Sequence, residues 1–422
     1  MRIFVKQNFN PSFMELKLSR WIKLWIGLLC ISSYQALGQP SQSASFLGQD
    51  TTRRVINTSV PFLNISPDAR AAGMGDVGVA TAPDVNATHW NPAKLVFIPN
   101  RSGFALSYSP WLRQFVNDMS ISYLSGFYQI DNKQAIGGSL RYFNLGNIQF
   151  TDGSGNLIRD FMPREVAFDA SYSRKLSDKL SLAVTARYIH SNLSADLLIG
   201  NQVETRPINS GSVDISMFYQ SNDIDFFGMR SKIAWGFNIS NIGPKVSYSN
   251  NRNNDFIPTN LRLGGAFTVK IDEFNRFTWA LDLNKLLVPT PPQINSQGQI
   301  IRGDDPRNLT VIQGMWAGLT YAPGGFSEKM QELMIATGLE YWYSDKFGSD
   351  LFSARLGYFH EDRNKGNRRY FSVGLGFRYN VFGLDVAYII PVVQNNPLAE
   401  TLRFSLIFNF KEKSAANNPD QD

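Results

Sequence analysis

Six residues from Gly73 to Gly78 have the spacing of a phosphate-binding loop. Gly73, Gly75 and Gly78 fit the pattern G-x-G-x-x-G, in which glycines let backbone amides approach the pyrophosphate of a dinucleotide. That chemistry needs a strand before the glycines and a helix after them. The sequence predicts neither, because Pro67 and Pro83 flank the segment. We therefore interpret the glycines as close-packing positions, not as a nucleotide site.

The other residues that could do chemistry are scattered. The three histidines are His89, His190 and His360, and no cysteine lies near any of them. Zinc sites usually combine clustered histidine, cysteine and acidic ligands, and the nucleophile motif G-x-S-x-G does not occur in the sequence. We expect no metal, no cofactor, no catalytic residue and no enzyme activity.

Charged residues recur at alternate positions inside apolar segments between Ser102 and Phe410. Neighbouring side chains of a strand point to opposite faces, so one face is apolar and the other is small, polar or charged. Two interpretations of the charges stay open: internal ion pairs, such as Arg187 with Asp214, or the lining of a selective pore. Arg355 with Asp385 is a second candidate pair. The charged residues on the small and polar face are Arg141, Glu165, Asp169, Arg187, Asp214, Lys232, Arg262, Lys270, Asp282, Glu340, Arg355, Arg378, Asp385 and Arg403.

These segments predict an all-β fold, a 14-stranded antiparallel transmembrane β-barrel with an N-terminal plug. Short turns are expected on the periplasmic side and long loops outside, and single-chain barrels have even strand numbers. A fifteenth strand at 309–321 would break that alternation, so we assign 287–331 as one long outer loop. The predicted strands are 103–110, 118–130, 133–146, 164–174, 178–192, 210–220, 231–242, 259–271, 275–286, 332–344, 350–360, 368–379, 382–390 and 399–410.

A secretory leader precedes the barrel. Lys17, Arg20 and Lys23 come before a short apolar run, and small residues end at Gly38. We assign 1–38 as a signal peptide. Its removal lowers the net charge from +6 to about +2 and removes Cys30, the single cysteine. The basic balance therefore gives no reason to expect a nucleic-acid partner.

Three further segments complete the domain prediction. Residues 39–100 form a flexible start and a plug, 101–410 the barrel, and 411–422 a polar tail. Within the plug, Gly73, Gly75 and Gly78 should make close backbone contacts, and Asn91 with Pro92 should form a turn before the first strand.

An apolar cluster occupies a predicted water-facing loop at 193–209. Leu197, Leu198 and Ile199 lie there with Leu193, and exposed apolar clusters often mark a partner surface. Two interpretations stay open: the cluster binds a partner, or the loop folds inward and caps the barrel. Leu197, Leu198 and Ile199 are our candidates for partner binding.

Several motifs carry a family resemblance that covers most of the chain. Together they resemble the FadL-like outer-membrane barrels and, among these, the PorV family of the type IX secretion system. The motifs are Asp68–Asp76, His89–Lys94, Ala322–Phe326, Gly357–Glu361, Lys365–Arg368 and Asn396–Phe404.

The resemblance implies a non-enzymatic protein of the cell outer membrane, in contact with its lipid. Such proteins bind the C-terminal signal domains of secreted cargo, take them from the translocon barrel, and deliver them to the surface attachment and signal-peptidase complex. The alternative is a FadL-like transporter that passes hydrophobic small molecules across the outer membrane.

The strand alternation also makes an energetic prediction. Leu182→Arg, on the lipid face, should cost about 2–4 kcal/mol if Leu182 lies near mid-membrane. Ser181→Arg, on the inner face, should cost less. The free energy of unfolding in lipid vesicles measures both.

Overall fold

The computed structural model describes residues 54–110, 118–151, 154, 156–193, 198–199, 203–204, 206–249, 254–295, 297, 299–392 and 401–410. The predicted leader at 1–38, the start of the next segment at 39–53, the tail at 411–422 and Leu197 lie outside this part of the chain. Their assignments stay predictions.

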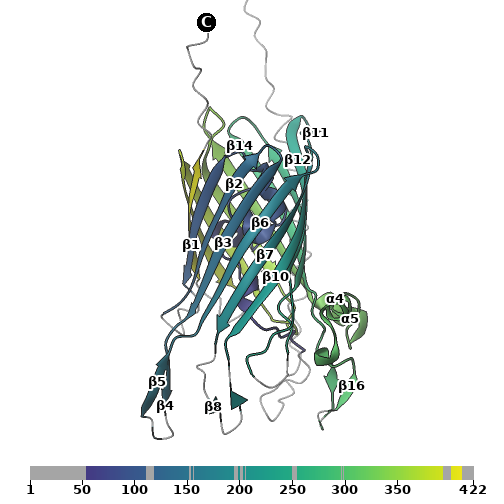
Figure 1. The fold of residues 1–422 in the computed structure, drawn as a ribbon. Helices are drawn as coiled ribbons and strands as arrows, with labels where there is room; N and C mark the ends of the chain where they lie inside the picture. Colours follow the sequence, from purple (N-terminus) through teal and green to yellow (C-terminus); the bar gives the residue numbers. More distant parts are fainter. Residues whose placement is uncertain are drawn as a thin grey trace, which may run out of the picture. The chain divides into compact units, whose positions relative to one another are not determined.

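Fourteen antiparallel strands form one closed barrel, as predicted (Figure 1). The first strand pairs with the last, Ser102 opposite Phe410, so the ladder runs round without a free edge. The barrel strands are β1 (Ser102–Pro110), β2 (Met119–Asp131), β3 (Gln134–Leu145), β6 (Arg164–Lys175), β7 (Leu180–Asn192), β10 (Ile208–Gln220), β12 (Met229–Ile242), β13 (Asn260–Lys270), β14 (Asn275–Leu286), β17 (Leu333–Ser344), β18 (Asp350–His360), β19 (Arg369–Tyr379), β20 (Phe382–Pro391) and β21 (Leu402–Phe410).

Most of the additional structure lies at the long-loop end of the barrel, the lower end in Figure 1. Three hairpins extend the connections that the sequence predicted only as loops: β4 (Ile148–Thr151) with β5 (Leu157–Phe161), β8 (Leu198–Ile199) with β9 (Val203–Glu204), and β15 (Gln293–Ile294) with β16 (Ile300–Arg302). The opposite end carries the short turns and β11 (Ile224–Phe226), which pairs with the start of β12.

The long connection between β14 and β17 is helical where a fifteenth strand was considered. It contains η3 (Pro306–Asn308), α4 (Val311–Thr320) and α5 (Gly325–Gln331). Thr310 and Gln313 start α4 with a capping box, each side chain bonding the other's backbone amide. The prediction that 287–331 adds no barrel strand is confirmed. Among the described residues, no helix has both the length and the apolar character needed to cross a membrane.

The barrel wall separates apolar from charged side chains as the alternation predicted. Large apolar side chains on the outer face are exposed, whereas the inward charges are buried except for three. Lys232 and Lys270 are exposed and Arg378 is half-buried, all near the short-turn end. Both predicted ion pairs are confirmed: Arg187 lies 2.9 Å from Asp214, and Arg355 lies 2.9 Å from Asp385.

Residues 54–101 are here called the N-terminal segment. Most of it lies inside the barrel (Figure 1, purple), whereas Arg54, at its start, contacts the long-loop end. Its residues inside the barrel pair with or pack on inward side chains of strands from β3 round to β21. Short helices shape the segment, because it turns repeatedly in a narrow space: η1 (Pro61–Asn64), α2 (Ala69–Gly73), α3 (Ala87–Trp90) and η2 (Pro92–Phe97).

Exposed arginines on β6 mark the edges of the apolar outer band. Arg174 faces outward opposite Leu182, and Arg164 faces outward opposite Asn192. The stretch between the two arginines is about 34 Å long at 3.4 Å per residue, and a tilt of about 45° reduces this to about 24 Å of thickness. That matches the roughly 25 Å apolar band of outer-membrane barrels. Ala186, outward-facing and midway, therefore lies near mid-membrane.

This geometry corrects the expectation for Leu182 and Ser181. Leu182 lies at the edge of the band beside Arg174, not near its middle. Ser181 is fully buried and donates a hydrogen bond to the Ala93 carbonyl at 2.5 Å, so an arginine there would have no room. The expectation that Ser181→Arg is the milder change was wrong.

Ala186→Arg should therefore destabilise the barrel by about 2–4 kcal/mol, and Leu182→Arg by only about 0–1 kcal/mol, because the cost of an outward charge depends on depth. Denaturant titration in lipid vesicles measures both, with Ala186→Leu as the apolar control. Equal costs for the two arginine variants would show that the band is not placed as we describe.

Candidate functional site: the barrel interior and the long-loop end

The start of α2 and the end of α3 are joined by one buried carboxylate. Asp68 caps α2 by accepting a hydrogen bond from the Ala71 amide at 2.9 Å. Its second oxygen accepts from the indole Nε1 of Trp90 at 2.7 Å. Both residues belong to motifs that carried the family resemblance. The contact shows that these motifs meet in space and fix the two short helices against each other.

The amides of the glycine loop already have acceptors within the protein. Gly78 and Val79 both donate to one carboxylate oxygen of Asp282, at 2.8 and 2.9 Å. Gly75 donates to the hydroxyl of Ser372 at 2.9 Å. A phosphate-binding loop needs such amides free for the ligand. In this chain they hold the N-terminal segment to β14 and β19.

Gly75 is the position where only glycine fits. Its φ of +73° lies in the left-handed region, and a Cβ there would lie 2.5 Å from the Tyr358 amide nitrogen. Gly73 and Gly78 are close-packed too. A Cβ on Gly73 would lie 3.0 Å from the Cα of Gly374, and one on Gly78 would overlap the Trp90 ring.

Asn91 and Pro92 begin η2, a more extended structure than the simple turn expected. The Asn91 carboxamide oxygen accepts from the Ala93 amide at 3.2 Å, and Pro92 is the first helical residue. The Asn91 amide group donates to the carbonyls of Val79 and Met217. One side chain thus connects the glycine loop, η2 and β10.

A chain of buried charges links the N-terminal segment to three strands. The guanidinium of Arg70 donates twice to Glu340, at 2.9 and 2.8 Å. Glu340 also accepts from Arg355 at 2.8 Å, and Arg355 in turn reaches Asp385. At its other end, this series of ion pairs finishes with the Asp84 carboxylate, 2.8 Å from the Arg70 guanidinium. Two-point contacts of this kind satisfy the planar guanidinium and carboxylate together.

A second network lies on the other side of the interior. Arg187 on β7 bridges Asp169 on β6, at 2.6 Å, and Asp214 on β10. Nearby, Arg141 on β3 donates to the carbonyls of Phe62 and Leu63 and contacts His89 Nδ1 at 2.6 Å. The interpretation as internal ion pairs therefore describes these charges better than a pore lining does.

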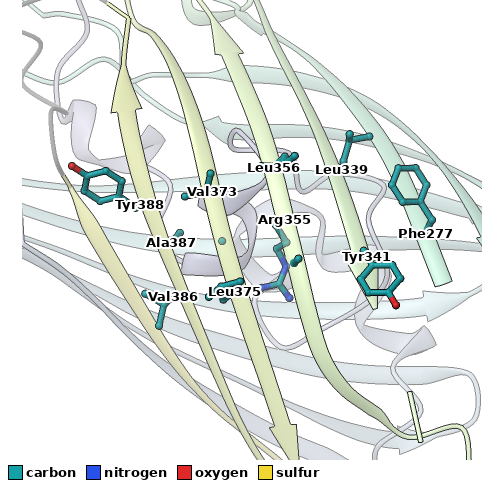
Figure 2. A pocket seen from close by; sticks show the side chains of 12 residues that line it. Phe277, Leu339, Tyr341, Arg355, Leu356, Val373, Leu375, Val386, Ala387 and Tyr388 are labelled. Atoms are coloured by element: carbon teal, nitrogen blue, oxygen red, sulfur yellow. The ribbon is translucent and has the colours of Figure 1, made fainter. Parts of the chain in front are cut away.

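An apolar groove of about 550 Å³ lies on the outer wall, not in the interior. Figure 2 shows it across β14 and β17 to β20, with Phe277 and Tyr341 on one side and Val386 and Tyr388 on the other. The outward parity of these side chains makes the groove part of the lipid-facing surface. It offers no path through the barrel.

The long-loop end carries a cluster of ion pairs that sequence reasoning missed. Glu328 accepts from Arg54 at 2.9 and 2.8 Å and from Lys365 at 2.7 Å. Burial alone raises the pKa of Glu328, but the bonds from Arg54 and Lys365 outweigh it and hold that pKa at about 2. Glu332 adjoins the cluster through Lys285 and Lys365. The motifs Lys365–Arg368 and Ala322–Phe326 were the sequence signals near it, the second through the Gly324 amide, which donates to Glu328 at 2.6 Å.

The partner-binding candidates are only partly described. Leu198 and Ile199 form β8, which pairs with β9 at the long-loop end. Leu197 lies outside the described residues. Among the residues that the structure describes, no three histidine, cysteine, aspartate or glutamate side chains are grouped to hold a metal ion.

Gly75→Val should impair docking of the N-terminal segment, because a side chain would strain a left-handed residue and overlap Tyr358. Gly348→Val is the matched control: Gly348 has a φ of +79° but nothing within 4 Å of a Cβ. We expect the strain of about 1–2 kcal/mol in both variants and the steric loss only at Gly75.

Thermal loss of heat-modifiable gel migration measures the difference between these variants. Equal stabilities would contradict the close packing described for Gly75. Binding of ATP or NAD by the unmodified protein would restore the nucleotide interpretation of the loop.

Solved structures of two toluene transporters and a FadL homologue are similar to this chain at low identity. The toluene transporter TbuX of Ralstonia pickettii is 10% identical, with 81% of this chain and 98% of that chain covered and a TM-score of 0.42. A FadL homologue of Pseudomonas aeruginosa is 11% identical, covering 85% and 100%, also with a TM-score of 0.42. The toluene transporter TodX of Pseudomonas putida is 9% identical, covering 80% and 95%, at 0.42. Because these TM-scores lie below 0.5, we infer nothing further from them.

The sequence itself gives the decisive comparison. No curated protein matches the chain. The family model described as "Type IX secretion system protein PorV" matches residues 48–293. This range takes in the N-terminal segment and the barrel strands from β1 to β14, together more than half of the chain. The protein therefore belongs to the PorV family of type IX secretion system proteins.

Proposed function

We propose that this protein is a non-enzymatic outer-membrane component of the type IX secretion system that carries cargo between two complexes. It binds the C-terminal signal domain of a secreted protein as the cargo leaves the translocon barrel. It then delivers that domain to the surface complex that removes the signal and attaches the cargo. Family membership supports this role and a location in the outer membrane.

The filled interior is the structural observation that supports a surface mechanism. Arg70, Glu340 and Arg355 cross the interior as one chain of ion pairs, and the glycine loop is bound to Asp282. A mechanism based on surface binding leaves these contacts intact. The long-loop end, with its three hairpins and two helices, offers the larger surface for a protein partner.

The rival function is transport of hydrophobic small molecules through the barrel. It would require the N-terminal segment to move and the ion pairs of Arg70 and Arg187 to separate or rearrange. Breaking a buried pair costs about 3–5 kcal/mol when one charge is left alone. The interior thus favours the carrier function over the transporter.

Replacing Leu197, Leu198 and Ile199 together by serine should weaken binding to the translocon or to cargo signal domains, since apolar anchors often carry the energy of an interface. Barrel assembly should be unchanged, because the three residues fall in the sequence between β7, which ends at Asn192, and β10, which begins at Ile208. The measurement is co-purification from detergent with protein identification, together with heat-modifiable gel migration.

The matched control replaces Ile294, Ile300 and Ile301 by serine, three exposed apolar residues of the β15–β16 hairpin at the same end. We expect co-purification to survive in the control. If the 197–199 variant also retains its partners and Asp214→Asn loses them, the loop hypothesis fails and an interior mechanism replaces it.

A further inference from the structure

The helices α4 and α5 expose an apolar face that the barrel does not cover. Ile312, Trp316 and Leu319 recur at helical spacing along α4 and are 71%, 68% and 44% exposed. On α5, Phe326 and Met330 are 80% and 48% exposed. Scattered apolar residues on a surface are ordinary, but five on two adjoining helices form a patch.

The opposite side of α4 is fixed to the protein through glycines. A Cβ on Gly314 would overlap the Phe256 ring, and one on Gly318 would lie 2.5 Å from the Val288 amide nitrogen. Lys329 on α5 donates to the Gly318 carbonyl at 2.8 Å, which closes the C-terminal end of α4. The two helices therefore hold the apolar patch in one orientation, facing away from the barrel.

The patch lies next to the edge of the lipid-facing band. Leu283 on β14 and Ile335 on β17 face each other across the ladder and are both exposed on the outer wall. The next outward position on β14 is Lys285, which is buried under Glu332 instead of facing lipid. The apolar band thus ends between Leu283 and Lys285, about 7 Å along the strand at 3.4 Å per residue.

The helices begin where this band ends. Leu287 and Val288, directly after β14, contact Gly318 of α4. Figure 1 shows α4 and α5 beside the lower rim of the barrel wall instead of across its mouth. Their apolar face is therefore continuous with the surface that contacts lipid acyl chains.

The side chains of the patch suit a membrane interface. Tryptophan and tyrosine concentrate where headgroups meet acyl chains, and Trp316 and Tyr321 are both exposed here. No charged side chain is exposed on α4 or α5, because Glu328 and Lys329 are turned inward to ion pairs. A short helix with one apolar face and no exposed charge can lie in the interface without a desolvation cost for charge.

We propose that α4 and α5 form an interfacial anchor, which lies in the lipid headgroup region and fixes the long connection 287–332 to the membrane surface. The inference does not depend on the proposed cargo function, since any barrel with this loop would place it there. Its occupant is the lipid bilayer. A protein partner on the same face is the alternative outcome.

Site-directed spin labelling tests the proposal. The single native cysteine, Cys30, is replaced by alanine, and Trp316→Cys and Leu319→Cys are labelled one at a time. Leu283→Cys is the lipid-facing reference, and Gln299→Cys, at an exposed polar position in the β15–β16 hairpin, is the water-facing control. The protein is placed in phosphatidylcholine nanodiscs without any other protein.

Labels at 316 and 319 should be severalfold more accessible to oxygen than to a water-soluble nickel chelate, as at 283, whereas 299 should show the reverse. Phe326→Cys and Met330→Cys repeat the measurement on α5 if either α4 variant fails the heat-modifiable migration test. If the patch positions are as accessible to nickel as position 299, the lipid anchor is excluded and the face is open for a protein partner.

Discussion

This barrel depends on one constraint: the charged side chains that its strands turn inward must be neutralised by partners. Every strand has two faces. Because one face contacts lipid, the charged side chains of Glu340, Arg355 and Asp385 point inward. An unpaired buried charge costs several kcal/mol, whereas a well-bonded pair roughly recovers that cost. Strand-to-strand pairs supply part of the solution. The N-terminal segment supplies the other part. Its Arg70 donates to both carboxylate oxygens of Glu340, whereas Arg355 bonds only one of them. The segment is therefore part of the electrostatic core and not a separate insertion.

This arrangement assigns different tasks to different parts of the molecule. The wall holds the interior and contacts lipid, and its outward side chains are almost entirely apolar in the band between Arg164 and Arg174. The two ends lie beyond this apolar band. At the long-loop end, Glu328 and Glu332 gather cations from sequence positions as distant as Arg54 and Lys365. That cluster joins the N-terminal segment and two strand connections, β14–β17 and β18–β19, into one platform.

The strands could be predicted from sequence because period-two alternation is a local signal, and it specified which face each charge would take. Depth was not predictable for Leu182, since it depends on Arg174, which the register of the neighbouring strand places opposite it. The space available for a larger side chain at Ser181 depends on Ala93 of the N-terminal segment, which is 88 residues away in sequence. Arg70 was missed as a partner of Glu340 because 270 residues separate them and no local pattern connects the two. The close packing of the glycine loop was predicted from its sequence, but its acceptor, Asp282, follows only from barrel closure.

The anchoring of the glycine loop has a consequence for how the protein moves with time. Gly75, Gly78 and Val79 lie outside any helix or strand, where amide protons normally exchange with water within seconds to minutes through local opening. Here each of these amides donates a hydrogen bond to a side chain of the barrel wall. Gly75 donates to Ser372, and Gly78 and Val79 donate to Asp282. Release of one requires the segment to leave the strands that surround it. We therefore expect the slowly exchanging amides of this protein to include residues that secondary structure alone would class as loop, with a protection that reports on the cohesion of the whole barrel.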